Sequence, residues 1–90
     1  NDADLVGQLL VDTVRSVEGV QTEREIDALL MEFTENQMVF KVGWWIASYE
    51  DLYPVRDRVS REVIQALKDA GVVLPYTTGS VRVEMKSKPE

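Results

Sequence analysis

The spacing of hydrophobic residues predicts a helix near the start of the chain, from Asp4 to about Val17. Within this stretch the hydrophobic residues recur at helical spacing, so they share one side of the helix. They are Leu5, Val6, Leu9, Leu10, Val14 and Val17. Gly19 follows at a position where helices commonly stop, because glycine readily adopts the left-handed conformation.

Two alternating runs in the middle of the chain predict an antiparallel hairpin. The first run, 26–34, predicts a strand with two distinct faces. We expect Leu29, Met31 and Phe33 on the face toward the core, and Ala28, Leu30 and Glu32 on the other. After a polar turn at 35–37, the run 38–46 places Met38, Phe40, Val42, Trp44 and Ile46 on one side. Two such runs joined by a short polar turn are typical of a hairpin.

A second helix is predicted after the hairpin. Ser48 and Asp51 are both typical N-cap residues. Pro54 falls in the first turn, where its missing N–H had no partner within the helix. The residues expected to be buried are Leu52, Val55, Val59, Val63, Ala66, Leu67 and Ala70. Gly71 stands where a left-handed C-cap is expected.

The chain ends in a third predicted strand, which completes the order helix, strand, strand, helix, strand. After Pro75 and a turn at 77–80, Val81, Val83 and Met85 alternate with polar residues. This order is that of a ferredoxin-like βαββαβ unit that lacks its first strand. We therefore predict an α+β fold, with an antiparallel sheet and two helices on one face. Residues 1–86 would form a single domain and residues 87–90 a tail. The other sheet face and an open edge would then need a partner.

Composition and charge exclude several classes of protein. The chain has 90 residues, enough for one core, and no cysteine for disulfides or thiolate metal sites. Its net charge is −6, with eleven acids and three bases in residues 1–51, and five acids and seven bases in residues 52–90. A nucleic-acid partner is excluded because it needs a cationic surface. The acidity instead favours solubility and a local field that enriches cations.

The hydrophobic runs are too short for this stretch to enter a membrane. The longest uninterrupted run is 42–47, whereas a spanning helix needs about 20 apolar residues. No signal peptide is visible. The chain opens inside a helical pattern without an initiator Met, so we expect a fragment whose membrane part lies outside it.

The residue types give little support for catalysis. The chain has no His and no Cys, which are the commonest bases, metal ligands and nucleophiles. Glu23, Glu25 and Asp27 alternate and could form a calcium or magnesium site. They lack the spacing of a calcium loop, so an exposed start of a strand is the preferred interpretation. The turn at 77–80 lacks the glycines and lysine of a phosphate loop. We predict no catalytic residue, no metal ligand and no cofactor.

Two adjacent tryptophans suggest a buried side and an exposed side of the second strand. Consecutive strand residues face opposite ways. Trp44 is in phase with Phe40 and Val42 and is expected in the core. Trp45 would lie on the outer sheet face, where aromatic residues are typical of interfaces. The alternative is a partly covered tryptophan without a binding role.

Several motifs between residues 32 and 84 resemble a known family. The second strand ends in Val-Gly-Trp-Trp-Ile, Tyr53 is followed after Pro54 by Val-Arg, and the second helix is followed by Ala-Gly-Val-Val-Leu-Pro-Tyr. These features resemble the C-terminal cytoplasmic domain of small-conductance mechanosensitive ion channels. The positions that carry the resemblance are Trp44, Val55, Arg56, Gly71, Pro75 and Tyr76. Thr77 departs from the family pattern, which has a second proline there, and residues 21–25 lack the usual prolines.

The resemblance implies a structural role in a membrane channel. Members of that family are homo-heptamers opened by bilayer tension, with a hollow cytoplasmic vestibule through which ions and solutes pass. This domain would form the vestibule's lower wall, on the cytoplasmic side of the inner membrane. It would contribute to subunit assembly, solute and ion filtering and gating. The isolated fragment is expected to be a monomer or a weak dimer.

Two other function classes share the predicted fold. A ferredoxin-like regulatory domain would bind a small molecule, usually at a dimer interface near a Gly-rich loop after the first strand, which this stretch would lack. An acylphosphatase-like enzyme would need an arginine in a phosphate-binding loop and an asparagine on a strand. Asn36 falls in a predicted turn and matches that requirement poorly.

Overall fold

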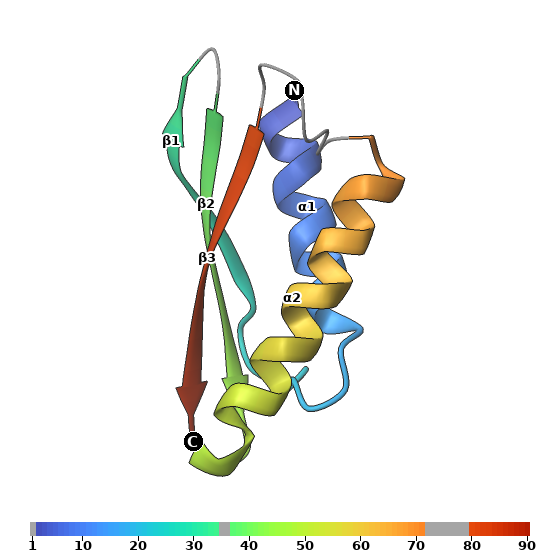
Figure 1. Cartoon of the computed structure of the whole chain (residues 1–90). Coiled ribbons are helices and arrows are strands. Elements are labelled where there is room, and N and C mark those ends of the chain that lie inside the picture. The colour runs from blue at the N-terminus through green and yellow to red at the C-terminus, as the bar shows by residue number, and fades with distance from the viewer. Residues whose placement is uncertain (1, 35–36, 72–79) are drawn as a thin grey trace.

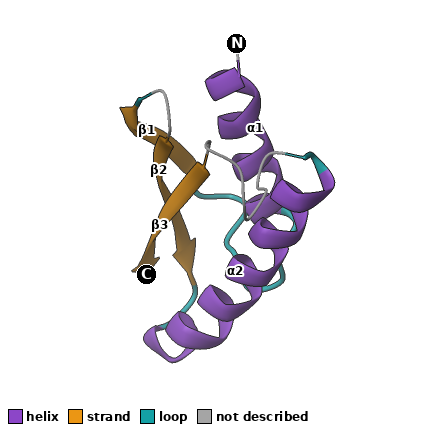
Figure 2. Ribbon diagram, turned by 45° about the horizontal axis from the view of Figure 1, so that its top comes forward, coloured by secondary structure: helices purple, strands orange, loops and turns teal. Residues whose placement is uncertain are grey.

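The computed structural model has two layers, with both helices on one face of a three-stranded sheet (Figures 1 and 2). The structure describes residues 2–34, 37–71 and 80–90. Its elements are α1 (Asp2–Arg15), β1 (Asp27–Phe33), β2 (Gln37–Ile46), the short 3₁₀ helix η1 (Tyr49–Asp51), α2 (Leu52–Asp69) and β3 (Ser80–Pro89). The predicted order and α+β class are confirmed. β3 continues to Pro89, so most of the predicted tail belongs to the sheet.

The core lies between the helices and the helix side of the sheet. α1 contributes Val6, Leu10 and Val14, α2 contributes Val55, Val59, Val63 and Leu67, and β2 contributes Phe40, Val42, Trp44 and Ile46. Both helical stripes are therefore largely as predicted. Leu5 is an exception at 70% exposed, and Ala70 is exposed as well. The alternation along β2 predicted its buried side correctly.

The sheet is mixed, because β1 is antiparallel to β2 whereas β3 is parallel to it. The sequence predicted a wholly antiparallel sheet, and the parallel pairing of β2 with β3 corrects that prediction. A strand that returns by way of a helix runs in the same direction as the strand before it. In the split arrangement another strand separates such a pair, but here β2 and β3 pair directly, from Gln37 opposite Ser80 to Ile46 opposite Pro89.

A bulge in β1 changes which of its side chains face the helices. Its register with β2 shifts between Leu30 and Glu32, which is the effect of one extra residue in a strand. Before the bulge, Leu29 lies opposite Lys41, on the outer face, and is 53% exposed. Its predicted place toward the core was wrong. After the bulge the phase is restored, and Phe33 shares the helix side with its partner on β2.

The same shift sets the cross-strand neighbour of Glu32. Glu32 lies opposite Val39, whereas Lys41 lies opposite Leu29. Unbroken alternation would place Glu32 and Leu29 on different faces, but one extra residue in a strand exchanges its two faces.

Two glycines allow sharp turns after the helices. Gly19 has φ +100°, and a Cβ there would lie 2.5 Å from Cγ2 of Val55. Gly71 has φ +71°, and its N–H donates to the carbonyl of Lys68 at 3.0 Å. Both positions confirm the predicted stops, since a left-handed backbone strains any residue with a Cβ.

The start of α2 differs in detail from the prediction. Ser48 precedes η1 and Asp51 precedes α2, so both stand at caps. Neither side chain makes a capping hydrogen bond.

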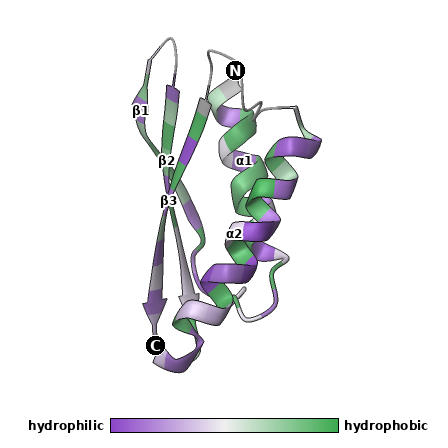
Figure 3. Ribbon diagram, viewed as in Figure 1, coloured by the Kyte–Doolittle hydropathy of each residue, from purple (hydrophilic) through white to green (hydrophobic). Residues whose placement is uncertain are grey.

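Figure 3 shows hydrophobic residues of both helices beside the sheet, and hydrophobic and hydrophilic residues following one another along β3.

Packing of α2 against the sheet can be tested with Leu67→Ala. Leu67 is 3% exposed, and removing a buried leucine side chain costs about 2–5 kcal/mol of unfolding free energy. Urea denaturation of the 90-residue chain would measure the loss. Ile64→Ala is the matched control, because Ile64 is one turn earlier and 52% exposed. An unchanged unfolding midpoint for Leu67→Ala would contradict the packing described here.

Candidate functional site

The candidate site is the outer face of the sheet with its two open edges. On this face β2 presents Val39, Lys41, Gly43 and Trp45, β3 presents Arg82, Glu84, Lys86 and Lys88, and β1 presents Asp27, Leu29 and Glu32. The three strands together contain three acids and four bases, whereas α1, η1 and α2 contain eight acids and five bases. The two layers of the domain therefore differ in the sign of their charge.

Trp45 lies on the outer face and is partly covered by two cations. Trp44, its neighbour, is fully buried, which confirms that the two indoles face opposite sides. The guanidinium carbon of Arg24 lies 3.9 Å from the Trp45 ring centroid, and Nζ of Lys88 lies 5.7 Å from it. Trp45, on β2, is thus contacted by one side chain from β3 and one from the loop before β1. Its role as an interface residue stays a prediction.

Backbone hydrogen bonds hold this loop in place at the end of β2. The N–H of Gln21 donates to the carbonyl of Trp45 at 2.9 Å. Arg24 also pairs with the carboxylate of Glu90 at 2.6 Å, and the N–H of Glu90 donates to the carbonyl of Ile46 at 3.1 Å. Exposed cation–π contacts contribute about 0.5–1 kcal/mol, so these contacts orient the loop more than they stabilise the fold.

A shallow hollow of about 170 Å³ lies over Gly43, where β2 has no side chain. The carboxylate of Asp27 enters it, with Oδ1 2.9 Å from the position that a Cβ on residue 43 would occupy. Oδ2 of Asp27 lies 3.8 Å from Nζ of Lys88. Lys41 and Lys86 line the same hollow. Glycine at residue 43 therefore makes room for one carboxylate among three lysines.

The acidic residues singled out as a metal site are not gathered into one. Asp27 is turned toward Gly43 and Lys88, while Glu23 and Glu25 are exposed in the preceding loop. Among residues 2–34, 37–71 and 80–90, no three acidic side chains come together as metal ligands would.

The outer edge of β1 is hydrophobic and exposed. Leu29 is 53% exposed, Leu30 43%, Met31 58% and Phe33 59%. In the described parts of the chain, β1 pairs with β2 alone, so its other edge offers backbone groups that no described strand pairs with. An exposed hydrophobic edge is typical of a surface that contacts another chain. The sequence indicates this exposed hydrophobic edge, because the four consecutive hydrophobic residues at 28–31 leave neither face of the strand polar.

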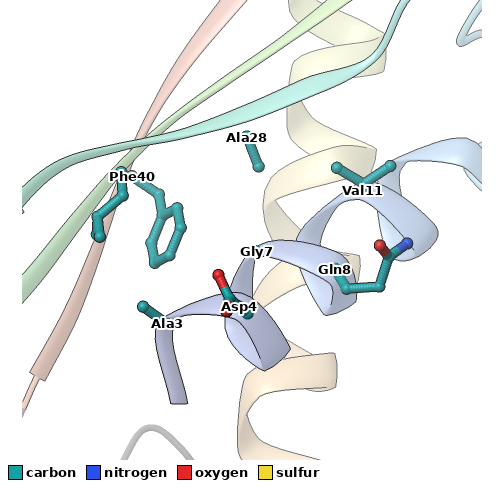
Figure 4. A pocket seen from close by; sticks show the side chains of 8 residues that line it. Ala3, Asp4, Gly7, Gln8, Val11, Ala28 and Phe40 are labelled. Atoms are coloured by element: carbon teal, nitrogen blue, oxygen red, sulfur yellow. The ribbon is translucent and has the colours of Figure 1, made fainter. Parts of the chain in front are cut away.

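A second hollow, of about 370 Å³, lies between α1 and β1 (Figure 4). It exists partly because Gly7 has no side chain beside the Phe40 ring, which lies 3.4 Å from the position of a Cβ. Its polar lining consists of Asp4 and Gln8. One carboxylate and one amide among apolar side chains supply no acid–base pair.

The residues that carried the family resemblance have structural positions. Trp44 and Val55 are core residues at 0% and 1% exposed. Nη2 of Arg56 donates to the carbonyl of Met85 at 3.1 Å and so joins α2 to β3. Gly71 forms the turn after α2. The two remaining positions, Pro75 and Tyr76, lie outside the described residues.

The described helices are too short or too polar to cross a bilayer.

The cover over Trp45 can be tested with Arg24→Gln. We expect acrylamide to quench tryptophan fluorescence more strongly, because Trp44 is fully buried and the added quenching reports Trp45. The unfolding free energy should fall by less than about 1 kcal/mol. Arg61→Gln is the control, since Arg61 pairs with Asp57 at 3.0 Å on the solvent side of α2. Equal quenching in both variants would show that Arg24 does not cover the ring.

Addition of metal ions should leave the melting temperature nearly unchanged. A ligand stabilises a protein only when it binds the native state preferentially. Calcium, magnesium and zinc at millimolar concentration would be compared by thermal unfolding of the chain. A shift of several degrees that saturates with the metal would contradict this expectation.

Comparison with models of known protein families gives a match over most of the chain. The family model described as "Mechanosensitive ion channel MscS, C-terminal" matches residues 1–74. The match includes α1, β1, β2 and α2 and ends before β3. No curated protein and no solved structure shows significant similarity to the chain.

Proposed function

The chain belongs to the MscS C-terminal domain family of mechanosensitive ion channels, and we propose that it forms a wall segment of such a channel's cytoplasmic vestibule. Its role in this proposal is structural and electrostatic, not catalytic. The observation that carries the proposal is the family match over residues 1–74. The architecture supports it, because a two-layer domain with two open sheet edges is suited to contacts with copies of itself.

The first part of the proposed role is assembly. A channel of this kind is built from identical subunits around one axis, and we propose a ring of seven. The hydrophobic edge of β1 is the surface whose exposure most favours a subunit contact, with Met31 and Phe33 more than half exposed. Covering such residues stabilises an assembly by about 25 cal/mol for each Å² of apolar surface buried.

The second part is filtering of ions by the unequal charge of the two layers. The helices, with eight acids and five bases, attract cations, whereas the strands have a small excess of bases. A passage lined by the helix layer would be enriched in cations. The effect reaches about 8–10 Å at physiological ionic strength, which limits it to solutes that pass close to the wall.

The third part is a mechanical link to gating. A wall can bias opening only if its contacts differ between the closed and open states. Contacts between subunits at the sheet edges are the ones that would change when the ring widens. The core of each subunit would move as one body, since α1, α2 and β2 share one continuous hydrophobic cluster.

Electrical recording from the full-length channel tests this proposal. Membrane patches that contain the channel should show currents that open with suction. Leu67→Ala should reduce the number of active channels severalfold, because it destabilises the wall, while Ile64→Ala should not. A channel without any current up to the tension that ruptures the patch would contradict the proposal. So would full activity when the domain is shown to be unfolded.

The isolated chain should be a monomer or a weak dimer at micromolar concentration. Contact along one strand edge falls below the roughly 1,000 Å² expected of a lasting interface. Sedimentation at several concentrations would measure this. A stable heptamer of the 90-residue chain would show that this domain drives assembly by itself. A tight dimer that depends on a small molecule would favour a regulatory domain instead.

A further inference from the structure

The hollow between α1 and β1 has an apolar side and a polar side (Figure 4). Its volume of about 370 Å³ lies near the lower end of the range for small-molecule pockets. The polar side is supplied by α1 alone, through Asp4 and Gln8. The apolar side comes from both layers of the domain and includes Ala3, Gly7, Val11, Ala28, Leu30 and Phe40.

The charge beside the hollow is negative. Asp4 contributes a full carboxylate charge, and the lining contains no base among the described residues. The only base of α1 is Arg15, in its last turn. The positive end of the helix dipole is equivalent to about half an elementary charge, which is less than the charge of Asp4 alone. The local field therefore attracts cations.

Two acceptors on α1 lie one helical turn apart beside the hollow. Asp4 and Gln8 have the i, i+4 spacing that places two residues on the same side of a helix, about 6 Å apart along its axis. The amide nitrogen of Gln8 donates to Oδ1 of Asp12 at 2.9 Å. This bond orients the amide and leaves its oxygen as an acceptor. The polar side thus offers one carboxylate and one amide oxygen in a row.

Gly7 keeps the space between α1 and the sheet open. A Cβ at this position would lie 3.4 Å from Cε1 of Phe40, so a side chain here would occupy part of the hollow. Glycine inside a helix is less stable than alanine. The stability of α1 alone therefore favours a side chain at residue 7, whereas the open hollow requires its absence.

We propose that this hollow binds a linear aliphatic diamine in its doubly protonated form. One ammonium group donates to the carboxylate of Asp4, and the other donates to the amide oxygen of Gln8. The methylene chain between them lies against Val11, Leu30 and Phe40, so that apolar surface of both ligand and protein is removed from water. This inference goes beyond the vestibule role proposed above and does not depend on it.

Other ligand classes use fewer features of the hollow. Calcium and magnesium need several oxygen ligands or retain their water shell, and they gain nothing from the apolar side. An anion would be repelled by Asp4. A monoamine would satisfy only one of the two acceptors. A diamine is the class that uses the charge, the second acceptor and the apolar side together.

A bound diamine would fasten the first half of α1 to the sheet. It contacts α1 through Asp4 and Gln8, and the sheet through Leu30 and Phe40. These residues come together only in the folded domain, so the ligand stabilises the native state.

Nuclear magnetic resonance of the 90-residue chain tests the proposal, with putrescine as the probe. Putrescine should shift the backbone amide signals of residues 4–11 and 28–30 and saturate in the millimolar range, while the signals of α2 stay unchanged. Magnesium chloride at equal concentration is the control for charge, and butylamine is the control for the second ammonium group. Magnesium should give no saturating shift at these residues, and butylamine should bind severalfold more weakly.

Three outcomes of these titrations would overturn the proposal. They are equal shifts from magnesium and putrescine, equal affinity for butylamine and putrescine, and putrescine shifts spread over the whole surface. Each would leave the proposed vestibule role standing, because that role rests on the family match.

Two variants separate binding from folding. Asp4→Asn should weaken putrescine binding severalfold, because the ammonium loses its charged partner. Glu62→Gln is the matched control, since it removes one exposed carboxylate from α2, and it should leave the affinity unchanged. Gly7→Ala should raise the melting temperature, since alanine favours a helix, and should still weaken binding severalfold by filling the hollow. Equal affinities in Asp4→Asn and Glu62→Gln, or full affinity in Gly7→Ala, would show that the diamine does not occupy this hollow.

Discussion

The structure depends on the position of β2. One face of this strand is buried beneath both helices, and each of its edges pairs with a neighbouring strand. Its inward residues include Trp44 and Ile46, both fully buried. Because β2 pairs along both of its edges, its own alternation assigns a face to most side chains of β1 and β3. The helices then have one apolar surface to cover. A polar residue at Val42 or Trp44 would leave an unpaired group in the centre of this surface.

Because β2 is the central strand, β1 and β3 form the two edges of the sheet, and the residues of these edges differ in character. β1 ends the sheet with an exposed hydrophobic and acidic edge, and β3 ends it with a basic one. An isolated domain gains nothing from such an arrangement, since exposed hydrophobic edges favour aggregation. In the proposed ring of identical subunits, contacts between copies would cover such an edge. The features that are unfavourable in one copy are thus the ones that an assembly can use.

Among the described residues, the motif positions that carry the family resemblance pack within the domain or form a turn. Trp44 and Val55 fill the core, and Arg56 joins α2 to the backbone of β3. They explain why the fold is recognisable from the sequence. They say little about the surfaces through which the domain acts. The β1 edge proposed for subunit contacts, with the exposed Met31 and Phe33, belongs to no motif.

Local periodicity was sufficient for the order of the elements, the buried stripes of both helices and the opposite orientation of Trp44 and Trp45. It also located the turns at Gly19 and Gly71, because a left-handed backbone has a clear residue preference. Three features needed contacts between distant segments. They are the direct pairing of β2 with β3, the bulge that turns Leu29 outward, and the cover of Trp45 by Arg24. Strand register depends on which strand becomes the neighbour, and one extra residue exchanges the faces. No pattern within a single strand contains that information.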